Sequence, residues 1–194
     1  MNIDLKKHIA LTSAGEVKQI CQPLFDFLGI NYFSFHRTYN DGSKIRLCTN
    51  PEWTEHYIKR NYIQSGRLER HPTIYKSGYS LWDYWPKDDV EHLVIKDARD
   101  NFNRDHGFSI VKNWEGYVDI YNLTTNINHG IINNAYLNYL RYIEKFTIYF
   151  MNKAFPLIEV AEKSKFIPEM DKSLFFSDDH SGLVNIEQEQ KIFS

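Results

Sequence analysis

Two segments of the chain alternate apolar and polar side chains, and this alternation limits the fold more than any other feature. The run "INYFSFHRTY" is followed by the turn residues "NDG" and a second alternating run, "KIRLCT". This pattern predicts an antiparallel hairpin. A second hairpin is predicted for "HGFSIVKNWEGYVDIYNLTT", with its turn near Glu115 and Gly116. The first strand should carry two opposite sets of side chains, Tyr32, Ser34 and His36 against Phe33, Phe35 and Arg37.

Helical patterns surround and separate the two hairpins. Ser13 and Glu16 have the spacing of a capping box, and Asn50 is a good N-cap before Pro51 at the first helical position. The stretch 65–86 has no pattern that assigns it. The apolar periodicity predicts helices over residues 14–28, 51–64, 88–104 and 131–163, the last bent at Pro156.

The order of elements is helix, hairpin, helices, hairpin and long helix. Helices packed on a small antiparallel sheet make an α/β/α sandwich, the layout of GAF-like and PAS-like sensor domains. A chain of 194 residues is long enough for one substantial core. We expect one domain over residues 1–165, and a polar, turn-rich linker or tail over residues 166–194.

Charge and hydropathy exclude several classes of protein. The chain has 23 Lys and Arg against 25 Asp and Glu, a formal net charge of -2, so no overall basic field attracts nucleic acid. Its first residues lack the apolar core of a signal peptide, and no apolar run is long enough to span a bilayer. We therefore expect a cytoplasmic protein with no membrane partner.

The sequence offers little that suggests catalysis. "TEHYIKR" is not a His-Glu-x-x-His zinc motif, and no glycine-rich phosphate loop follows a strand. Cys48 and His36 could meet across the first hairpin, but nothing in the sequence orients the imidazole for nucleophilic catalysis. We expect no enzymatic role, no metal site and no cofactor.

Three motifs, in order, cover most of residues 13–163. "NPEWTEHYIKRNY" has a Trp, a Tyr four residues later and a further aromatic nine after the Trp; "SGYSLWD" leads to a second Trp; and "ARDNFNRDHGFSI" contains His-Gly before a strand. This series resembles the autoinducer-binding domain of LuxR-type transcription regulators. The residues that carry the resemblance are Trp53, Tyr57, Tyr62, Trp82, His106 and Gly107.

The resemblance implies a cavity that holds an N-acyl homoserine lactone. Trp53 matches the residue whose indole N–H donates to the lactone carbonyl, and Tyr57 matches the residue that bounds the acyl chain. Trp82 matches the residue that packs near the head group. A polar residue on the last hairpin strand commonly contacts the ligand amide, and here either Asn122 or Thr124 falls in that region.

Three further residues complete the candidate site. Trp85 forms an aromatic pair with Trp82. Ser34 and His36 share a strand face, from which they either point into a pocket or serve as paired polar groups at a sheet edge. The sequence favours neither alternative for these two side chains.

One departure from the family pattern bears on the ligand. Family members have Asp-Pro thirteen residues after the first Trp, and the Asp accepts a hydrogen bond from the ligand amide; here the positions hold Gly66 and Arg67. A buried amide donor left unpaired costs ~1–3 kcal/mol, enough to decide ligand identity. A short insertion could place Glu69, beside His71 and Pro72, in this role. Otherwise the pocket recognises a different ligand, or none.

The resemblance implies the ligand-sensing domain of a transcription regulator that binds a small amphiphilic signal and forms a homodimer partly through its C-terminal helix. DNA binding would then need the family's helix-turn-helix domain, which does not appear before Ser194. The alternative is a ligand-free interaction module that pairs with a full-length regulator of this type.

Overall fold

The computed structural model describes residues 4–65, 76–85 and 90–167. Helical and extended elements alternate along this part of the chain. In chain order they are η1 (Leu5–Lys7), α1 (Ile9–Thr12), α2 (Ala14–Leu28), β1 (Tyr32–Tyr39), β2 (Lys44–Cys48), α3 (Pro51–Lys59), α4 (Tyr62–Ser65), β3 (Gly78–Leu81), η3 (Trp82–Tyr84), α6 (Val90–Phe102), β4 (Asp105–Trp114), β5 (Tyr117–Thr125), α7 (Ile132–Asn138), α8 (Leu140–Lys153) and α9 (Phe155–Glu162).

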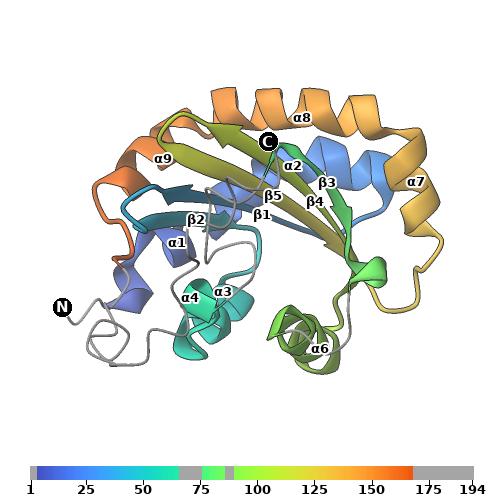
Figure 1. Ribbon diagram of the computed structural model, residues 1–194, viewed down its shortest axis with the longest axis horizontal. Coiled ribbons are helices and arrows are strands. Elements are labelled where there is room, and N and C mark those ends of the chain that lie inside the picture. Colours follow the sequence, from blue (N-terminus) through green and yellow to red (C-terminus); the bar gives the residue numbers. More distant parts are fainter. Residues whose placement is uncertain (1–3, 66–75, 86–89, 168–194) are drawn as a thin grey trace, which may run out of the picture.

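The described strands form one antiparallel sheet in the order β2-β1-β5-β4-β3. Both predicted hairpins are present, and they pair through their long strands β1 and β5 at the centre of the sheet. Figure 1 shows α2, α7 and α8 over one face of this sheet and α3, α4 and α6 under the other. The predicted α/β/α sandwich is therefore confirmed.

The two faces of β1 separate as the alternation predicts. Phe33 and Phe35 are fully buried in the larger core, which lies between the sheet and helices α2, α7, α8 and α9. Tyr32 faces the opposite layer and belongs to a second, smaller apolar cluster with Trp53 and Tyr57 of α3. The two clusters lie on opposite sides of the sheet.

Helix α2 ends as its sequence predicts but begins differently. Gly29 adopts a left-handed conformation, φ 69°, and its N–H caps the helix by donating to Phe25 O. The predicted capping box is wrong, because α1 already makes the chain helical before Ser13. The Ser13 hydroxyl instead donates to Ile9 O at 2.6 Å.

The helix predicted over residues 51–64 is two helices. Its start is confirmed, because the side chain of Asn50 accepts a hydrogen bond from the backbone N–H of Trp53 at 2.7 Å and Pro51 follows. Helix α3 ends at Lys59, since Asn61 adopts a left-handed φ of 59° that an α-helix does not permit. Helix α4 then begins at Tyr62.

The long helix predicted over residues 131–163 is also interrupted, into α7, α8 and α9. The breaks lie at Tyr139 and Ala154, whose backbone angles depart from those of a helix. Pro156 lies in the first turn of α9 instead of bending a continuous helix, a position where its missing N–H has no cost. Apolar residues on both sides of each break contact the same core, so the periodicity continues through them.

The sheet has one more strand than the two hairpins supply. Strand β3, in the stretch that the sequence left unassigned, pairs with β4 at the edge of the sheet. Near the end of the described chain, Phe166 exchanges two backbone hydrogen bonds with Lys44 of β2. Most of the expected tail, residues 168–194, lies outside the described residues, and the domain boundary near residue 165 stays a prediction.

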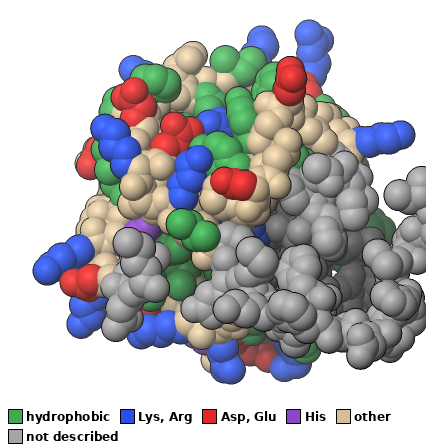
Figure 2. Space-filling view, turned by 60° about the vertical axis from the view of Figure 1, so that its left-hand side comes forward, with side chains coloured by type: hydrophobic (Ala, Val, Ile, Leu, Met, Phe, Trp, Pro, Cys, Tyr) green, Lys and Arg blue, Asp and Glu red, His purple; other side chains and the backbone are tan. Residues whose placement is uncertain are grey.

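The charged surface matches the balanced composition. Acidic and basic side chains are interspersed over the face shown in Figure 2. Among the described residues, no helix combines the length and apolar character needed to cross a bilayer.

Candidate functional site

A row of small polar side chains crosses the sheet on the face toward α3 and α6. The strand registers pair these residues directly across all five described strands. The row consists of Cys48, Ser34, Asn122, Ser109 and Ser80. Along its centre, the Ser109 hydroxyl donates to Asn122 Oδ1 at 2.6 Å, and Asn122 Nδ2 donates to Ser34 Oγ at 3.4 Å. This row, which we call the polar floor, therefore presents hydrogen-bonding groups toward helices α3 and α6.

Helix α3 places Trp53 and Tyr57 over this floor, both almost fully buried. The Trp53 ring packs edge-on against Phe102 of α6, with centroids 5.0 Å apart. Its backbone N–H is used by the helix cap, whereas its indole N–H forms no hydrogen bond within the described part of the chain. Because Trp53 lines the cavity described below, this donor is available to a guest molecule.

Trp82 approaches the same floor from the other end. It follows edge strand β3, and its indole N–H donates to Ser109 Oγ at 2.7 Å. The ring lies directly on the backbone of Gly107, where an added Cβ would overlap it. Trp85 stacks on Trp82 with centroids 5.5 Å apart, and its indole donates to Ser80. Gly107 is therefore a steric requirement for the position of Trp82.

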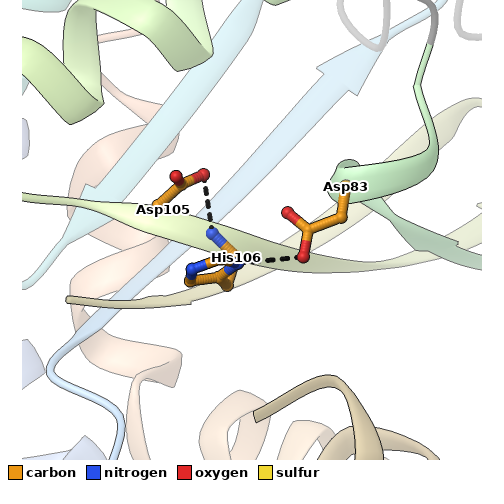
Figure 3. A group of neighbouring side chains, drawn as sticks. All are labelled: Asp83, Asp105 and His106. Atoms are coloured by element: carbon orange, nitrogen blue, oxygen red, sulfur yellow. Dashed lines mark hydrogen bonds and ion pairs between the residues drawn. The ribbon is translucent and has the colours of Figure 1, made fainter. Parts of the chain in front are cut away.

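The His-Gly motif fixes this end of the site. His106 lies within β4, not at a helix end, and has a left-handed φ of 51°. Its Nδ1 is 2.9 Å from Asp83 Oδ2 and its Nε2 is 3.1 Å from Ile127 O, while Asp105 accepts from the His106 backbone N–H at 2.9 Å (Figure 3). Burial opposes protonation of His106, but the bonds to Asp83 and Ile127 outweigh it and raise its pKa.

Asp83, Asp105 and His106 could also be considered as metal ligands, since their ligand atoms lie within 4.8 Å of one another. Both ring nitrogens of His106 already have protein partners, and Asp105 also pairs with Arg99 at 3.3 Å. These contacts within the protein explain why the three side chains lie together: they connect η3, β4 and the segment after β5, and we call them the His106 clamp.

Arg46 of β2 lies buried at the opposite end of the floor. It is paired in register with His36, and its guanidinium contacts the His36 ring. It also donates to the Tyr32 hydroxyl at 3.0 Å and lies over the Tyr57 ring at 4.3 Å. Burial raises the pKa of Tyr32, so its hydroxyl stays protonated at neutral pH.

Arg104 is brought into the site by the end of α6. Asn103 takes a left-handed φ of 51°, and the Arg104 N–H donates back to Ala98 O at 3.2 Å, which closes the helix and reverses the chain. The guanidinium lies over Tyr32 at 3.1 Å and near Trp53 at 5.0 Å. Burial lowers the pKa of Arg104, which nevertheless remains charged.

These side chains surround a cavity of about 40 Å³ between the sheet and helices α3 and α6. The volume holds roughly one to three water molecules, whereas pockets for drug-sized ligands measure roughly 300–1,000 Å³. The candidates from the sequence that line it are Ser34, His36, Trp53, Tyr57, Trp82 and Asn122. It is also lined by residues that were not candidates, namely Tyr32, Arg46, Val94, Ala98, Arg104 and Ile120.

The remaining candidates lie elsewhere. Asn122, not Thr124, lines the cavity, because the Thr124 hydroxyl accepts a hydrogen bond from Arg104 Nε at 3.2 Å. Tyr62 packs edge-on against Tyr57 and donates its hydroxyl to Asp97, and Trp85 stacks on Trp82 without lining the cavity itself. Gly66, Arg67 and Glu69, the positions that bear on the missing family Asp, lie outside the described residues.

Two of the missed residues had a signal in the sequence. Arg46 lies in the second alternating run, and strand pairing brings it beside His36. For Arg104 the signal was Asn103, because Asn is a common helix terminator and the residues after it leave the helix axis.

Comparisons with known proteins place this geometry in a known fold. No protein-family model and no curated protein sequence matches the chain. Among solved structures, the N-acylhomoserine lactone dependent LuxR family transcription factor CepR2 from Burkholderia cenocepacia matches with a TM-score of 0.52 and 13% identity, over 80% of this chain and 99% of that one.

SdiA in complex with octanoyl-rac-glycerol matches with a TM-score of 0.51 and 12% identity, and SdiA of Escherichia coli with 0.52 and 11%. Each match covers 86% of this chain and 68% of the SdiA chain. At these identities the likeness is one of fold. It confirms that the chain has the fold of LuxR-type autoinducer-binding domains, as the three sequence motifs implied.

Proposed function

We propose that this domain is a non-enzymatic cytoplasmic sensor of a small amphiphilic molecule, which binds between the sheet and helices α3 and α6. The observation that carries the proposal is the indole N–H of Trp53, which has no partner in the described chain at a cavity with a polar floor. The fold supports it, because the similar structures include a regulator named for its dependence on N-acylhomoserine lactone and a complex with an acyl glycerol.

A ligand of this size requires the cavity to expand. Helices α3 and α6 are linked to each other, by His56 and Asp97 at 2.6 Å and by Trp53 packed on Phe102. They face the polar row of the sheet, whereas the opposite helices are joined to the sheet by the larger apolar core. Burial of apolar surface supplies most of the free energy that holds helices against a sheet. The α3–α6 pair, which is held by the smaller apolar cluster, is therefore the layer that moves away from the sheet when a ligand enters.

Ligand-dependent stabilisation tests the proposal. We expect N-octanoyl-homoserine lactone, octanoyl glycerol or a component of bacterial extract to raise the melting temperature. At a ligand concentration of a hundred times Kd, the free energy of unfolding should increase by about 2.7 kcal/mol. Trp53→Phe removes the indole donor, so it should weaken binding about tenfold. Trp114→Phe is the matched control, because Trp114 is 51% exposed and does not line the cavity. Equal ligand responses in both variants would reject the role of Trp53.

We further propose that ligand binding favours a homodimer and so controls DNA binding by a regulator that contains this domain. Support comes from a band of half-exposed aromatic side chains on α2 and α8, where Phe27 packs edge-on against Tyr139 and tilted against Tyr142. Tyr142→Glu should produce a monomer in light scattering, while the exposed control Tyr84→Glu should not change the mass. Identical masses for both variants would exclude this face as the interface.

The cavity volume favours a second candidate function, a ligand-free module that pairs with another regulator. At about 40 Å³ the interior is nearly filled by its own aromatic side chains. In this case native mass spectrometry finds no co-purifying small molecule, no extract shifts the melting temperature, and Trp53→Phe leaves pairing unchanged. A bound molecule that Trp53→Phe releases would exclude this alternative.

A further inference from the structure

We infer that Arg104 is the receptor for a carboxylate on the ligand, so that the preferred guest is a small amphiphilic anion. The inference rests on the proposed sensing function and specifies its ligand class. A guanidinium presents a planar fork of N–H donors that matches the two oxygens of a carboxylate. A neutral ester or lactone carbonyl can accept from this fork but cannot neutralise its charge.

The first support is that Arg104 is buried and only partly paired. The residue is 5% exposed, and it lines the cavity. Its Nε donates to Thr124 Oγ1 at 3.2 Å, but Nη1 is buried without any hydrogen-bond partner among the described residues. The guanidinium also lies over the rings of Tyr32 and Trp53. One edge of the fork is therefore available to an acceptor in the cavity.

The second support is the charge of the cavity wall. Among the described residues that line the cavity there is no Asp or Glu, while two arginines, Arg46 and Arg104, are present. Asp105, the acidic residue next in the chain, pairs with Arg99 and with the backbone of His106. A carboxylate that enters between Arg104 and Trp53 would meet a positive field in a setting that excludes water, where electrostatic attraction is strong.

A purely structural role explains Arg104 poorly. The stacking of its guanidinium on aromatic rings offsets part of the cost of burying the charge, but a buried cation without a counter-ion is seldom the most stable choice for a core. A hydrophobic side chain of similar length would fill the same space. We therefore expect Arg104→Met to fold with unchanged or increased stability in the absence of ligand, as is common when binding groups are replaced.

The chemical class follows from the rest of the wall. Val94, Ala98 and Ile120 supply apolar surface beside the aromatic rings, which suits an acyl or alkyl chain. The polar floor of Asn122 and Ser34 suits an amide or hydroxyl near the head group. The fitting guest is an acyl compound that ends in a carboxylate, either a medium-chain fatty acid or an N-acyl amino acid.

Matched pairs of test compounds isolate the carboxylate. N-octanoyl-homoserine differs from its lactone by ring opening, and straight-chain acids from hexanoate to dodecanoate differ from their methyl esters by the charge. Titration calorimetry and thermal shift, performed at slightly acidic pH where the lactone is stable, should show the acids binding about tenfold to a hundredfold more tightly. Esters and lactone binding as tightly as the acids would overturn the inference while leaving the sensing function intact.

Variants connect the preference to Arg104. Arg104→Met should abolish the difference between acid and ester, and Arg104→Lys, which keeps the charge but not the fork, should reduce it about tenfold. Lys96→Met is the control, since it removes the same charge from an exposed position on α6. A preference that persists in Arg104→Met overturns the inference; if that variant does not fold, an undiminished preference in Arg104→Lys does so.

Failure of the inference and failure of the proposed function remain distinguishable. If neither acids nor esters bind, the anionic class is rejected. The sensing function is rejected with it only if bacterial extract also leaves the melting temperature unchanged.

Discussion

The contact between Gly107 and Trp82 supplies a sharp test of how this site is built. An added Cβ at Gly107 would overlap three atoms of the Trp82 ring, the farthest of which, Cε2, would be 2.6 Å away. Gly107→Ala must therefore displace the indole, which loses its hydrogen bond to Ser109 and its stacking on Trp85. One hydrogen bond and one aromatic pair together contribute about 2 kcal/mol, so the melting temperature should fall by roughly 4–8 °C.

Urea unfolding followed by tryptophan fluorescence measures this loss, and near-ultraviolet circular dichroism reports the Trp82–Trp85 stacking directly. Gly15→Ala is a matched control with the opposite sign. Gly15 lies on the exposed face of α2, and an added Cβ there would meet nothing within 4 Å. Alanine should stabilise the helix by about 0.5–1 kcal/mol. If Gly107→Ala unfolds within about 0.5 kcal/mol of the wild type and keeps its aromatic spectrum, the steric argument is wrong.

Three further outcomes follow from other contacts. The pKa of His106 is raised above 6.5, so the stability that its contact with Asp83 contributes is fully present below pH 6.5 and is lost as pH rises through the folded-state pKa. His106→Gln should therefore reduce the dependence of the urea midpoint on pH. Asp119→Asn breaks a buried two-pronged bond to Arg37, at 2.7 and 3.0 Å, and should cost about 3 kcal/mol in urea unfolding; a cost below about 1 kcal/mol would contradict that estimate. Asn103 has a left-handed φ of 51°, which asparagine tolerates better than alanine, so Asn103→Ala should cost about 1 kcal/mol. Asn103→Gly, which has no β-carbon, should unfold close to the wild type in the same assay.

The sheet could be predicted where the sequence alternates. A period of two leaves only two faces, so the assignment of Phe33 and Ser34 to opposite layers followed from the pattern and is confirmed. Strand β3 could not be found in this way, because four residues at the sheet edge, 78–81, are too short for alternation to stand out beside an unpatterned stretch.

The helix breaks could not be predicted because the apolar pattern continues through them. Ile143, Phe150 and Ile158 contact one core from α8 and α9, so the apolar period runs through the break at Ala154. Periodicity records which face is buried, and it does not record where the backbone hydrogen bonds stop. Residue types that tolerate positive φ, such as Asn and Gly, are more informative about where a helix ends.

The site was predictable in its aromatic residues and not in its cations. Trp53 and Trp82 belong to motifs with recognisable spacing, and both line the cavity. Arg104 was placed by the sequence at the end of a helix, where a basic residue is ordinarily a solvated partner of the helix dipole. Its burial depends on the chain reversal, which Asn103 signals, and on the hydrogen bond to the distant Thr124, which no local pattern contains.

The unequal faces of the sheet have an evolutionary consequence. The apolar face anchors α2 and α8 through the large core, so most changes there would damage folding. The row of Ser34, Asn122 and Ser109 contributes hydrogen bonds that are individually worth little, and Ser34 and Asn122 line the cavity. Substitutions along that row can therefore accumulate in a lineage that carries this domain and change the lining of the cavity, while the inherited architecture stays the same.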